Sequence, residues 1–387
     1  MNRFYADFHI HIGRTTSGRP VKITGARSLT LENIIRESTE IKGLNMIGII
    51  DCHVPEVIDE FEALIEDGTV VPQEEGGLRF KDVAVIPGSE IEIYDDYSRG
   101  AFHVLVFFPD LYKMKQFSAW LSGHMKNITL SSQRYYGTGK SLQEKTKELG
   151  GLFIVAHAFT PHKGLYGSGV ERRLTEVLDP DKIDAIELGL SANTEMADQI
   201  PELHRYPYLS NSDAHSLPKM AREYQTIEME KPTFHEFQMA LREEKGRKIT
   251  ANYGLDPRLG KYHRTMCENC YEVIEDTAAR VCPHCGNRRI TRGVYDRLQE
   301  LREESREYPE RPPYVHQVPL EFIPKLGPKT LMKLRDHFKT DMAILHEVPE
   351  EALKEVVSEQ LADYILQARY GKLSIRIGGA GRYGKVN

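Results

Sequence analysis

The chain has 387 residues, of which 40% are hydrophobic and 28% are charged, and its formal net charge is -6. This length and composition predict two or three folded domains with ordinary hydrophobic cores. No run approaches the roughly 18 apolar residues of a membrane helix, and no basic segment followed by an apolar one stands at the N-terminus. We therefore expect a cytoplasmic protein with no membrane partner.

The net charge hides a local excess of basic residues in the C-terminal part. From Gly371 onward the chain has no acidic residue but carries Lys372, Arg376, Arg382 and Lys385. Basic residues also surround the cysteine segment between positions 258 and 297. Such local patches bind phosphate groups whatever the total charge is. A solvated surface that confers solubility is the alternative interpretation.

Residues 1 to 245 alternate strand-like and helix-like segments, which predicts a parallel sheet with crossover helices. A helix is expected over residues 30–42, with Thr30 as its N-cap and Gly43 as its stop. Long insertions interrupt the pattern at residues 13–27 and 159–173. The seven predicted strands are one fewer than in the common eight-stranded barrel. They span residues 4–11, 46–51, 83–93, 102–108, 152–157, 184–190 and 208–213.

Every predicted strand carries, at or near one end, a side chain that can bind a metal ion. The first closes with Asp7-Phe8-His9-Ile10-His11, and the period of two places Asp7, His9 and His11 on one face. The others carry Asp51 and His53, Glu90, His103, His157, Glu187, and Asp213 and His215. Strands that deliver such side chains to one rim are typical of a β/α-barrel active site.

Imidazoles and carboxylates gathered at one rim predict two or three divalent ions, for which zinc, manganese, magnesium and iron are all suitable. That arrangement suits the hydrolysis of a phosphate ester. The alternative is a set of unrelated core residues, each satisfied by its own hydrogen bonds. Burying so many ionisable groups without metal would be costly, which argues against that alternative.

These residues resemble the motifs of the polymerase and histidinol phosphatase (PHP) superfamily. Residues 5–11 resemble its first motif and Asp51-Cys52-His53 its second. The later motifs are resembled by Glu90, His103, His157 and Asp213-Ala214-His215. The resemblance covers almost all of residues 1–220 and implies an α/β fold, a distorted seven-stranded β/α barrel with up to three metal ions.

Carried over residue by residue, the resemblance implies three metal positions. One takes His9, His11, Glu90 and Asp213. The second shares Glu90 and adds His103 and His157. The third uses His53 and His215, with Asp51 nearby. The family usually supplies another His or Asp shortly after the first motif, where this chain has Gly13-Arg14-Thr15-Thr16-Ser17.

The chemistry expected of such a centre is attack on phosphorus by a water whose pKa the ions have lowered towards neutrality. The charges of the ions would stabilise the pentavalent transition state. Asp213 is the residue that we expect to orient or deprotonate the water. Asp7 is expected to orient a ligating imidazole rather than to bind metal itself.

Four of the five cysteines form two Cys-x-x-Cys pairs, Cys267 with Cys270 and Cys282 with Cys285, separated by eleven residues. Without a secretion signal, such pairs favour zinc over disulfides. We predict a zinc ribbon with one structural zinc, because four thiolates leave no open position for catalysis. The ribbon either only stabilises a small domain or also offers its basic rim to a phosphate backbone.

The last part of the chain is expected to be helical, and residues 322–330 resemble the hairpin of a helix-hairpin-helix element. In that element, backbone N–H groups at a turn such as the one at Gly327 hold a DNA phosphate. Lys325 and Lys329 would add positive charge beside the turn. Residues 345–368 resemble a second, degenerate unit. A plain helical interaction domain is the alternative interpretation.

Barrel, ribbon and helical tail, in this order, resemble the endonuclease Q family over essentially the whole chain. We expect a metal-dependent barrel at 1–248, a zinc-ribbon domain at 249–305, and a Pro-rich linker, helix-hairpin-helix-like domain and basic tail at 306–387. The family incises DNA on the 5′ side of uracil, hypoxanthine, xanthine and abasic sites. The resemblance implies products with a 3′-hydroxyl and a 5′-phosphate.

Reading such a lesion requires that the nucleotide be turned out of the base stack into a pocket, which we expect beside the metals. The two insertions and the stretch 131–140, with Tyr135 and Tyr136, are candidates to line it. Asn193 and Asn211 could hydrogen-bond a base edge. Ordinary packing is the alternative for each aromatic side chain.

Two other functions compete with the repair endonuclease. One is a PHP-type small-molecule phosphatase or 3′ exonuclease with accessory nucleic-acid-binding domains. The other is a non-catalytic DNA-binding scaffold, against which the nearly complete set of ligands argues. Damaged DNA, double- or single-stranded, is the expected partner, and a sliding clamp is a further candidate that the sequence does not establish.

Overall fold

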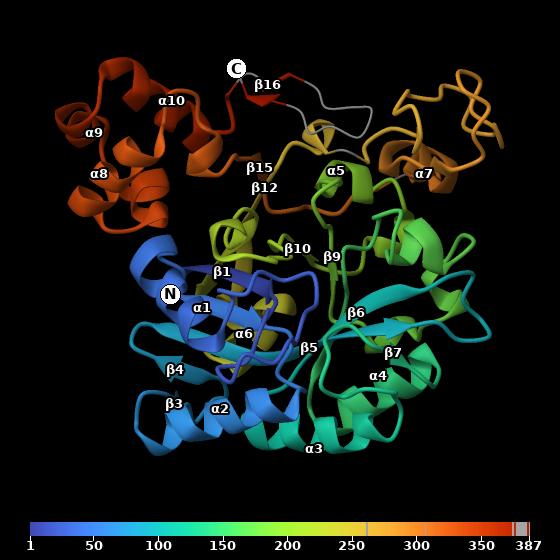
Figure 1. The fold of residues 1–387 in the computed structure, drawn as a ribbon, viewed down its shortest axis with the longest axis horizontal. Helices are drawn as coiled ribbons and strands as arrows, with labels where there is room; N and C mark the ends of the chain where they lie inside the picture. The colour runs from blue at the N-terminus through green and yellow to red at the C-terminus, as the bar shows by residue number, and fades with distance from the viewer. Residues whose placement is uncertain (261, 306, 374, 377–384, 387) are drawn as a thin grey trace.

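One mixed sheet runs through the computed structural model (Figure 1), which describes residues 1–260, 262–305, 307–373, 375–376 and 385–386. Its strand order is β10-β9-β8-β6-β5-β2-β1-β11-β12-β15. Beside this path, β4 (Leu78–Phe80) and β7 (Arg134–Tyr135) pair with β5, and β3 (Val71–Pro72) pairs with β4. The strands that build the barrel are β1 (Asn2–Ile10), β2 (Met46–Ile49), β5 (Val83–Ile93), β6 (Phe102–Phe107), β8 (Leu152–Val155), β9 (Ala185–Glu187) and β10 (Tyr208–Leu209). The added strands are β11 (Tyr224–Met229), β12 (Lys248–Gly254) and β15 (Tyr314–His316).

The α/β fold predicted from the sequence is confirmed, because all seven predicted strands are present and lie side by side in the curled sheet. The segment after β10 returns to the first strand. There the N–H of His11 donates to the carbonyl of Ala214 at 3.2 Å, and the N–H of Ala214 donates to that of His9 at 3.0 Å. These two bonds bring the end of β1 and the segment after β10 to one rim.

The strands are not all parallel, which differs from the expectation. β6 is antiparallel to both β5 and β8, whereas β1, β2 and β5 run parallel. The reason is the short connection, residues 94–101, because a parallel crossover needs a dozen or more residues. As a result β6 begins at the rim where its antiparallel neighbours β5 and β8 end. His103, near the start of β6, therefore comes to the same rim as the strand-end residues.

Helices cover the outside of the sheet (Figure 1): α1 (Leu31–Arg36), α2 (Pro55–Glu66), α3 (Leu111–Ser122), α4 (Gly139–Glu148) and α6 (Phe234–Leu241). The helix predicted at 30–42 begins as expected, with the Thr30 hydroxyl accepting the N–H of Asn33, and stops at Gly43 with φ 77°. Its second half, Glu37–Lys42, is a π-helix. On α6, Phe237 stacks on Phe8 with ring centroids 4.1 Å apart, which fastens this helix to β1.

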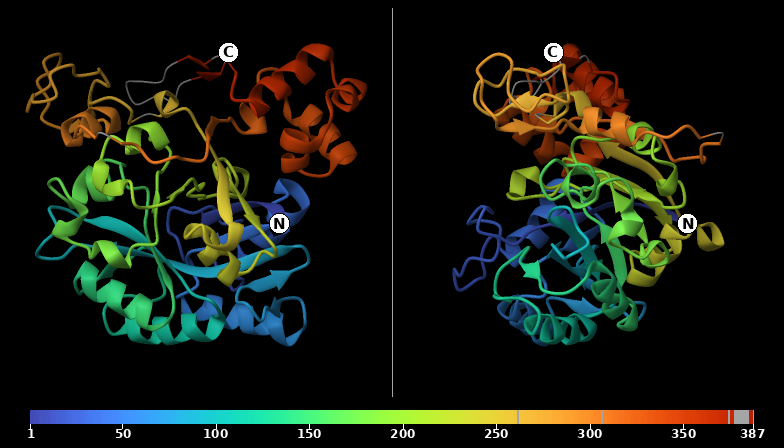
Figure 2. Two further views of the ribbon diagram at one scale, coloured as in Figure 1. Left: turned by 180° about the vertical axis from the view of Figure 1, so that it is seen from behind. Right: turned by 90° about the vertical axis from the view of Figure 1, so that its right-hand side faces the viewer.

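The described residues after 254 lie along one side of the barrel (Figures 1 and 2). The cysteine segment, with β13 (Met266–Cys267), β14 (Ile290–Thr291) and α7 (Val294–Leu301), stands at one end. Helices α8 (Pro328–Phe338), α9 (Glu350–Val356) and α10 (Glu359–Arg369) stand at the other. Between them β15 pairs in parallel with β12, so the predicted Pro-rich linker contributes a strand to the barrel sheet. The predicted boundary at 248 falls within β12.

The helical segment is fastened to the barrel by a small aromatic cluster. The ring of His346 stacks on Tyr5 with centroids 5.0 Å apart, and the hydroxyl of Tyr224 lies 2.6 Å from Nε2 of His346. Nearby, Nζ of Lys42 pairs with Asp341 at 3.2 Å.

Within the described residues, no helix is both long enough and apolar enough to cross a membrane.

Candidate metal centre and nucleic-acid contacts

Seven of the predicted ligands meet at the rim of the barrel, in three groups whose ligand atoms lie within 4.8 Å of one another. The first group is His9, His11 and Glu90. The second is Glu90, His103 and His157. The third is His11, Asp213 and His215. Glu90 belongs to two groups, so its two oxygens could bridge two ions.

The histidines of the first strand are oriented from behind by carboxylates. Nδ1 of His9 lies 2.9 Å from Glu187, and Nδ1 of His11 lies 3.1 Å from Asp51. A carboxylate on Nδ1 leaves Nε2 as the nitrogen that can bind metal. Both Nε2 atoms are buried and make no hydrogen bond to any described residue. Buried polar atoms are rarely left without a partner, so this arrangement fits a metal ion.

Glu90 lies at the middle of the centre, where three histidines surround its carboxylate. Its Oε1 lies 3.0 Å from Nδ1 of His103, 3.3 Å from Nε2 of His157 and 3.4 Å from Nε2 of His9. Burial alone would raise the pKa of Glu90, but His103 and Lys22 outweigh it and hold this pKa well below the usual glutamate value. Glu90 is therefore a carboxylate, the form that binds metal.

Asp213 combines strain with access to solvent. Its backbone has φ 44°, and His157 across the rim has φ 27°. Both values lie in the left-handed region, which residues other than glycine rarely adopt. Arg222 holds the segment by donating to the carbonyls of Ser212 at 2.6 Å and Asp213 at 3.1 Å. The Asp213 side chain is 31% exposed, whereas Glu90 is buried, so Asp213 faces the open side of the centre.

Two predicted ligands lie outside these groups. Nδ1 of His53 is 2.7 Å from the hydroxyl of Ser89, and its Nε2 is 3.3 Å from the carbonyl of Leu130. Asp51 accepts the N–H of Ile12 at 2.8 Å and faces Nδ1 of His11, so it lies behind an imidazole. Asp7 does not orient an imidazole as expected. It accepts the N–H groups of Ser212 and Ala221, each at 3.0 Å, and so fixes the segment that carries Asp213.

The four cysteines of the predicted ribbon come together as expected. The Sγ atoms of Cys267 and Cys285 are 3.6 Å apart, and so are those of Cys270 and Cys282. A tetrahedron with Zn–S bonds of about 2.3 Å has S–S edges of about 3.8 Å, so the geometry fits zinc. Each pair closes a tight turn whose last residue has positive φ, Tyr271 with φ 60° and Gly286 with φ 73°.

A cavity of about 240 Å³ opens beside the metal centre. His157 and Asp213 form its wall towards the centre. Three further segments line it. Thr160 and His162 come from the 159–173 insertion, Leu190 and Ser191 follow β9, and Leu255 and Tyr262 follow β12. Asn193 and Asn211 do not line it. Asn193 caps α5 (Thr194–Ala197), and Asn211 accepts the N–H of Phe8.

The predicted DNA contacts differ in how accessible they are. Lys325, Gly327 and Lys329 are exposed at the N-terminus of α8, where Gly327 is the N-cap. Tyr136 is 46% exposed, and Arg134 lies 5.1 Å from its ring centroid. Tyr135, in contrast, is buried, and its hydroxyl lies 2.9 Å from that of Ser141. Tyr135 is therefore a packing residue that a base cannot reach in this conformation.

Comparisons with known proteins identify the family of the chain, although no protein-family model matches it. The chain is 54% identical to the YqxK protein of Bacillus subtilis (strain 168) over 388 aligned residues, 100% of each chain. It matches the crystal structure of the lesion-specific endonuclease PfuEndoQ from Pyrococcus furiosus with a TM-score of 0.85 and 33% identity, over 100% of this chain and 95% of that one. This chain belongs to the endonuclease Q family.

A second structure of the family is endonuclease Q in complex with a 27-mer duplex substrate with an abasic lesion at the active site. It matches with a TM-score of 0.84 and 33% identity, over 100% of this chain and 96% of that one. Membership of the endonuclease Q family confirms the predicted class of enzyme. The chain is an endonuclease, a hydrolase of phosphodiester bonds.

In this member of the endonuclease Q family, the centre also contains Glu187, whose role the sequence did not indicate, and Lys22, which was not predicted. Glu187 orients His9 and accepts the N–H of His157 at 3.0 Å. Because Glu187 ends a predicted strand, the sequence indicated that it could bind a metal ion. The structure shows instead that it holds two predicted ligand histidines in place. Lys22 places its Nζ 3.0 Å from Oε2 of Glu90. The insertion that carries Lys22 was expected to line the lesion pocket, but no sequence feature singled out Lys22 itself.

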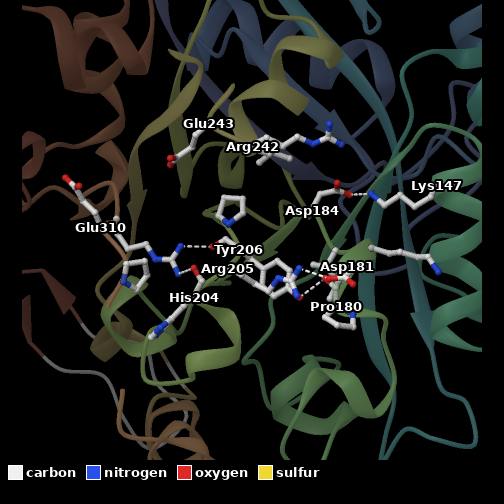
Figure 3. Close-up of a pocket in the computed structure, with 16 residues that line it drawn as sticks. Lys147, Pro180, Asp181, Asp184, His204, Arg205, Tyr206, Arg242, Glu243 and Glu310 are labelled. Carbon is white, nitrogen blue, oxygen red and sulfur yellow. Dashed lines mark hydrogen bonds and ion pairs between the residues drawn. The ribbon is translucent and has the colours of Figure 1, made fainter. Parts of the chain in front are cut away.

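A larger cavity of about 630 Å³, shown in Figure 3, shares no lining residue with the metal centre. None of its lining residues is a predicted site residue. Its charged side chains are largely paired with one another or with close neighbours: Lys147 with Asp184, Arg205 with Asp181 at 2.6 Å, and Arg311 with Asp198 at 2.9 Å. Because these charges are already satisfied, the cavity offers few free groups to a ligand.

Proposed function

We propose that this endodeoxyribonuclease repairs DNA by hydrolysing the phosphodiester on the 5′ side of uracil, hypoxanthine, xanthine and abasic sites. The observation that carries the proposal is the cavity beside Asp213 and His157, which gives an extrahelical nucleotide a place next to the metal ligands. The family structure with an abasic lesion at its active site supports DNA as the substrate. The predicted cytoplasmic location is part of this proposal, since DNA is the substrate.

The groups around Glu90 are assigned to two divalent ions, with zinc, manganese and magnesium as candidates. His9, His11, Glu90 and Asp213 hold the first ion, and Glu90, His103 and His157 hold the second. When bound, such ions lower the pKa of water and stabilise the charge that develops on a transferring phosphoryl group. The ribbon holds one structural zinc, which supplies folding energy only.

Asp213 is the proposed proton acceptor. Burial opposes its ionisation, but His9 and the neighbouring imidazoles hold its pKa well below the usual aspartate value, so it is ionised at neutral pH. The water oxygen forms a bond to phosphorus while the bond from phosphorus to the 3′-oxygen breaks. The 3′-oxygen leaves with a proton as a hydroxyl group, and the phosphate stays on the 5′ side of the lesion.

The duplex on either side of the lesion would be held through its backbone. The exposed N-terminus of α8 presents N–H groups and a positive dipole end to a phosphate, with Lys325 and Lys329 on either side. Tyr136 with Arg134 and Lys126 forms an exposed aromatic and basic patch of the kind that stacks on bases. A sliding clamp, the other predicted partner, has no support from the comparisons and is not part of this proposal.

The proposal is tested with end-labelled duplexes that each carry one uracil, hypoxanthine, xanthine or abasic site, next to an unmodified duplex, with the divalent ion varied. We expect a single cut on the 5′ side of each lesion, a 3′-hydroxyl product and no cut in the unmodified control. Equal cutting of all duplexes would remove the lesion specificity from the proposal.

The same experiment separates the competing functions. Progressive shortening from the 3′ end, equal in damaged and undamaged DNA, would identify a 3′ exonuclease. Release of phosphate from small esters without any cutting of DNA would identify a phosphatase. Tight binding of the lesion duplex without cleavage under any divalent ion would identify a scaffold. Each of these three results would contradict the proposed endonuclease reaction.

A further inference from the structure

Lys22 is a half-buried cation that contacts the central carboxylate of the metal centre. Its Nζ lies 3.0 Å from Oε2 of Glu90 and 2.5 Å from the hydroxyl of Ser132. Its side chain is only 13% exposed. It comes from the 13–27 insertion rather than from a strand, so it belongs to none of the metal-binding motifs.

The backbone of the insertion holds Lys22 in place. The N–H of Lys22 donates to the carbonyl of Ile12 at 2.9 Å, and the N–H of Ala26 donates to that of His215 at 2.8 Å. Gly13 and Gly25 let the two arms of the insertion touch, since a Cβ on Gly13 would lie 2.1 Å from the carbonyl oxygen of Ala26. The main chain that carries Lys22 is therefore fixed by hydrogen bonds and close packing, unlike that of a lysine on an exposed surface loop.

The donors of the centre are enough for two ions but not for three. Nδ1 of His11 faces Asp51, so only Nε2 can bind metal, and one nitrogen lone pair serves one ion. His11 therefore completes either the first group or the third, and not both. His53, the other predicted ligand of a third ion, is engaged by Ser89 and the carbonyl of Leu130. Asp213 and His215 then remain as an incomplete set.

We propose that the barrel holds two divalent ions and that the ammonium of Lys22 takes the place of a third, contacting a non-bridging oxygen of the scissile phosphate. With the carboxylate of Glu90 engaged by an ion, the ammonium of Lys22 would be free to turn towards the substrate. A lysine is a compact charge with three donors, which suits a phosphate oxygen whose charge grows in the transition state. The inference rests on the proposed function for its substrate, but the ion count can be measured independently.

The first test is the metal content of the purified, metal-saturated protein, measured by mass spectrometry of the elements. We expect about three ions per chain in the wild type, two in the barrel and one in the ribbon. Lys22→Asp replaces the ammonium with a ligand and should raise the content to about four ions per chain. Four ions per chain in the wild type, or three in Lys22→Asp, would overturn the proposal that Lys22 takes the place of a third ion.

The second test measures the phosphate contact. In an Asp213→Asn background that does not cleave, Lys22→Met should reduce the slope of log affinity against log salt for an abasic duplex by about one. With Asp213 intact, Lys22→Met should lower single-turnover cleavage about 100-fold or more, with its metal content unchanged. Lys22→Arg keeps the charge and should recover a large part of the rate.

Arg19→Met is the matched control, because Arg19 lies on the same insertion but is 79% exposed and paired with Glu56. It should leave the cleavage rate within about twofold of the wild type. An unchanged salt slope and rate in Lys22→Met would overturn the phosphate contact. If the wild type cleaved no lesion duplex, the proposed function would fail, while the ion counts would still decide the role of Lys22 in the centre.

Discussion

At the scale of single residues, His9, His11 and Asp213 are each positioned by a second side chain. Glu187 and Asp51 stand behind the two histidines of the first strand, and Arg222 holds the backbone of Asp213. An imidazole bound on Nδ1 by a carboxylate presents Nε2 in one direction, so the centre is preorganised before an ion arrives. The functional roles of individual residues follow from these contacts and can be tested one by one.

Asp213→Asn should lower single-turnover cleavage of a lesion duplex by at least about 1000-fold, because the amide can neither accept the proton nor carry the charge. Binding of the duplex, measured by fluorescence anisotropy, should stay close to that of the wild type. Asp96→Asn, at an exposed position between β5 and β6, is the control for the lost charge. Wild-type cleavage by Asp213→Asn would contradict the assigned role.

His103→Asn and His53→Asn should differ in metal content. His103 shares Glu90 with His157, so its loss should remove about one ion per chain and lower cleavage about 100-fold. His53 is bonded to Ser89 and to a backbone carbonyl, so His53→Asn should keep all its ions. Loss of the same ion from both variants would restore His53 as a ligand.

At the scale of elements, the connection between strands decides which residues reach the rim. The short link from β5 to β6 reverses the strand direction and brings His103 to the ligand side. The strand β15 in the predicted linker likewise exists because it pairs with β12. The junction between η10 (Ala343–Glu347) and the barrel contains a half-buried histidine, His346, which contacts Tyr5 and Tyr224.

Burial lowers the pKa of His346 to about 3, with Arg369 and Arg3 adding to the effect, so the folded protein keeps this imidazole neutral. The unfolded chain binds a proton near pH 6.5, so the unfolded state gains protons first as the pH falls. Stability should therefore decrease from about pH 6.5 towards pH 3, by about 2 kcal/mol between pH 7.5 and 5.

His346→Gln removes this titration, so its free energy of unfolding should fall less than that of the wild type over the same interval. Denaturant unfolding at pH 7.5 and 5 measures both proteins, and all other titrating groups cancel in the difference. An equal loss of stability in the two proteins would show that His346 is not the group responsible.

At the scale of the whole molecule, the helical segment and the barrel form one unit, whereas the ribbon has its own small core. β15 pairs with β12 of the barrel sheet, and His346 packs on Tyr5 and Tyr224. The buried cysteines of the ribbon, together with Ile274, form a separate apolar cluster. The two C-terminal parts should therefore respond differently when they are removed.

A chain that ends at residue 305 should be destabilised, because it loses β15, leaves β12 as an open edge and exposes the aromatic cluster. We expect its melting temperature to fall by more than about 5 °C and part of it to aggregate on size-exclusion chromatography. The comparison is a full chain in which a short Gly-Ser linker replaces residues 266–291. That variant should keep the melting temperature of the barrel and lose one zinc. Equal melting of the truncated and intact chains would contradict this account.

The sequence by itself determined the seven strands, the residues at their ends and the four cysteines. These features are local: a period of two, an apolar run closed by a ligand, a spacing of two residues between thiols. Which ligands meet, and which stand behind them, was decided only by the tertiary structure. Asp51 and His53 share a motif, yet one faces His11 and the other faces Ser89. Lys22 reaches Glu90 across 68 residues of chain, and only the packing of the insertion onto the rim brings the two together.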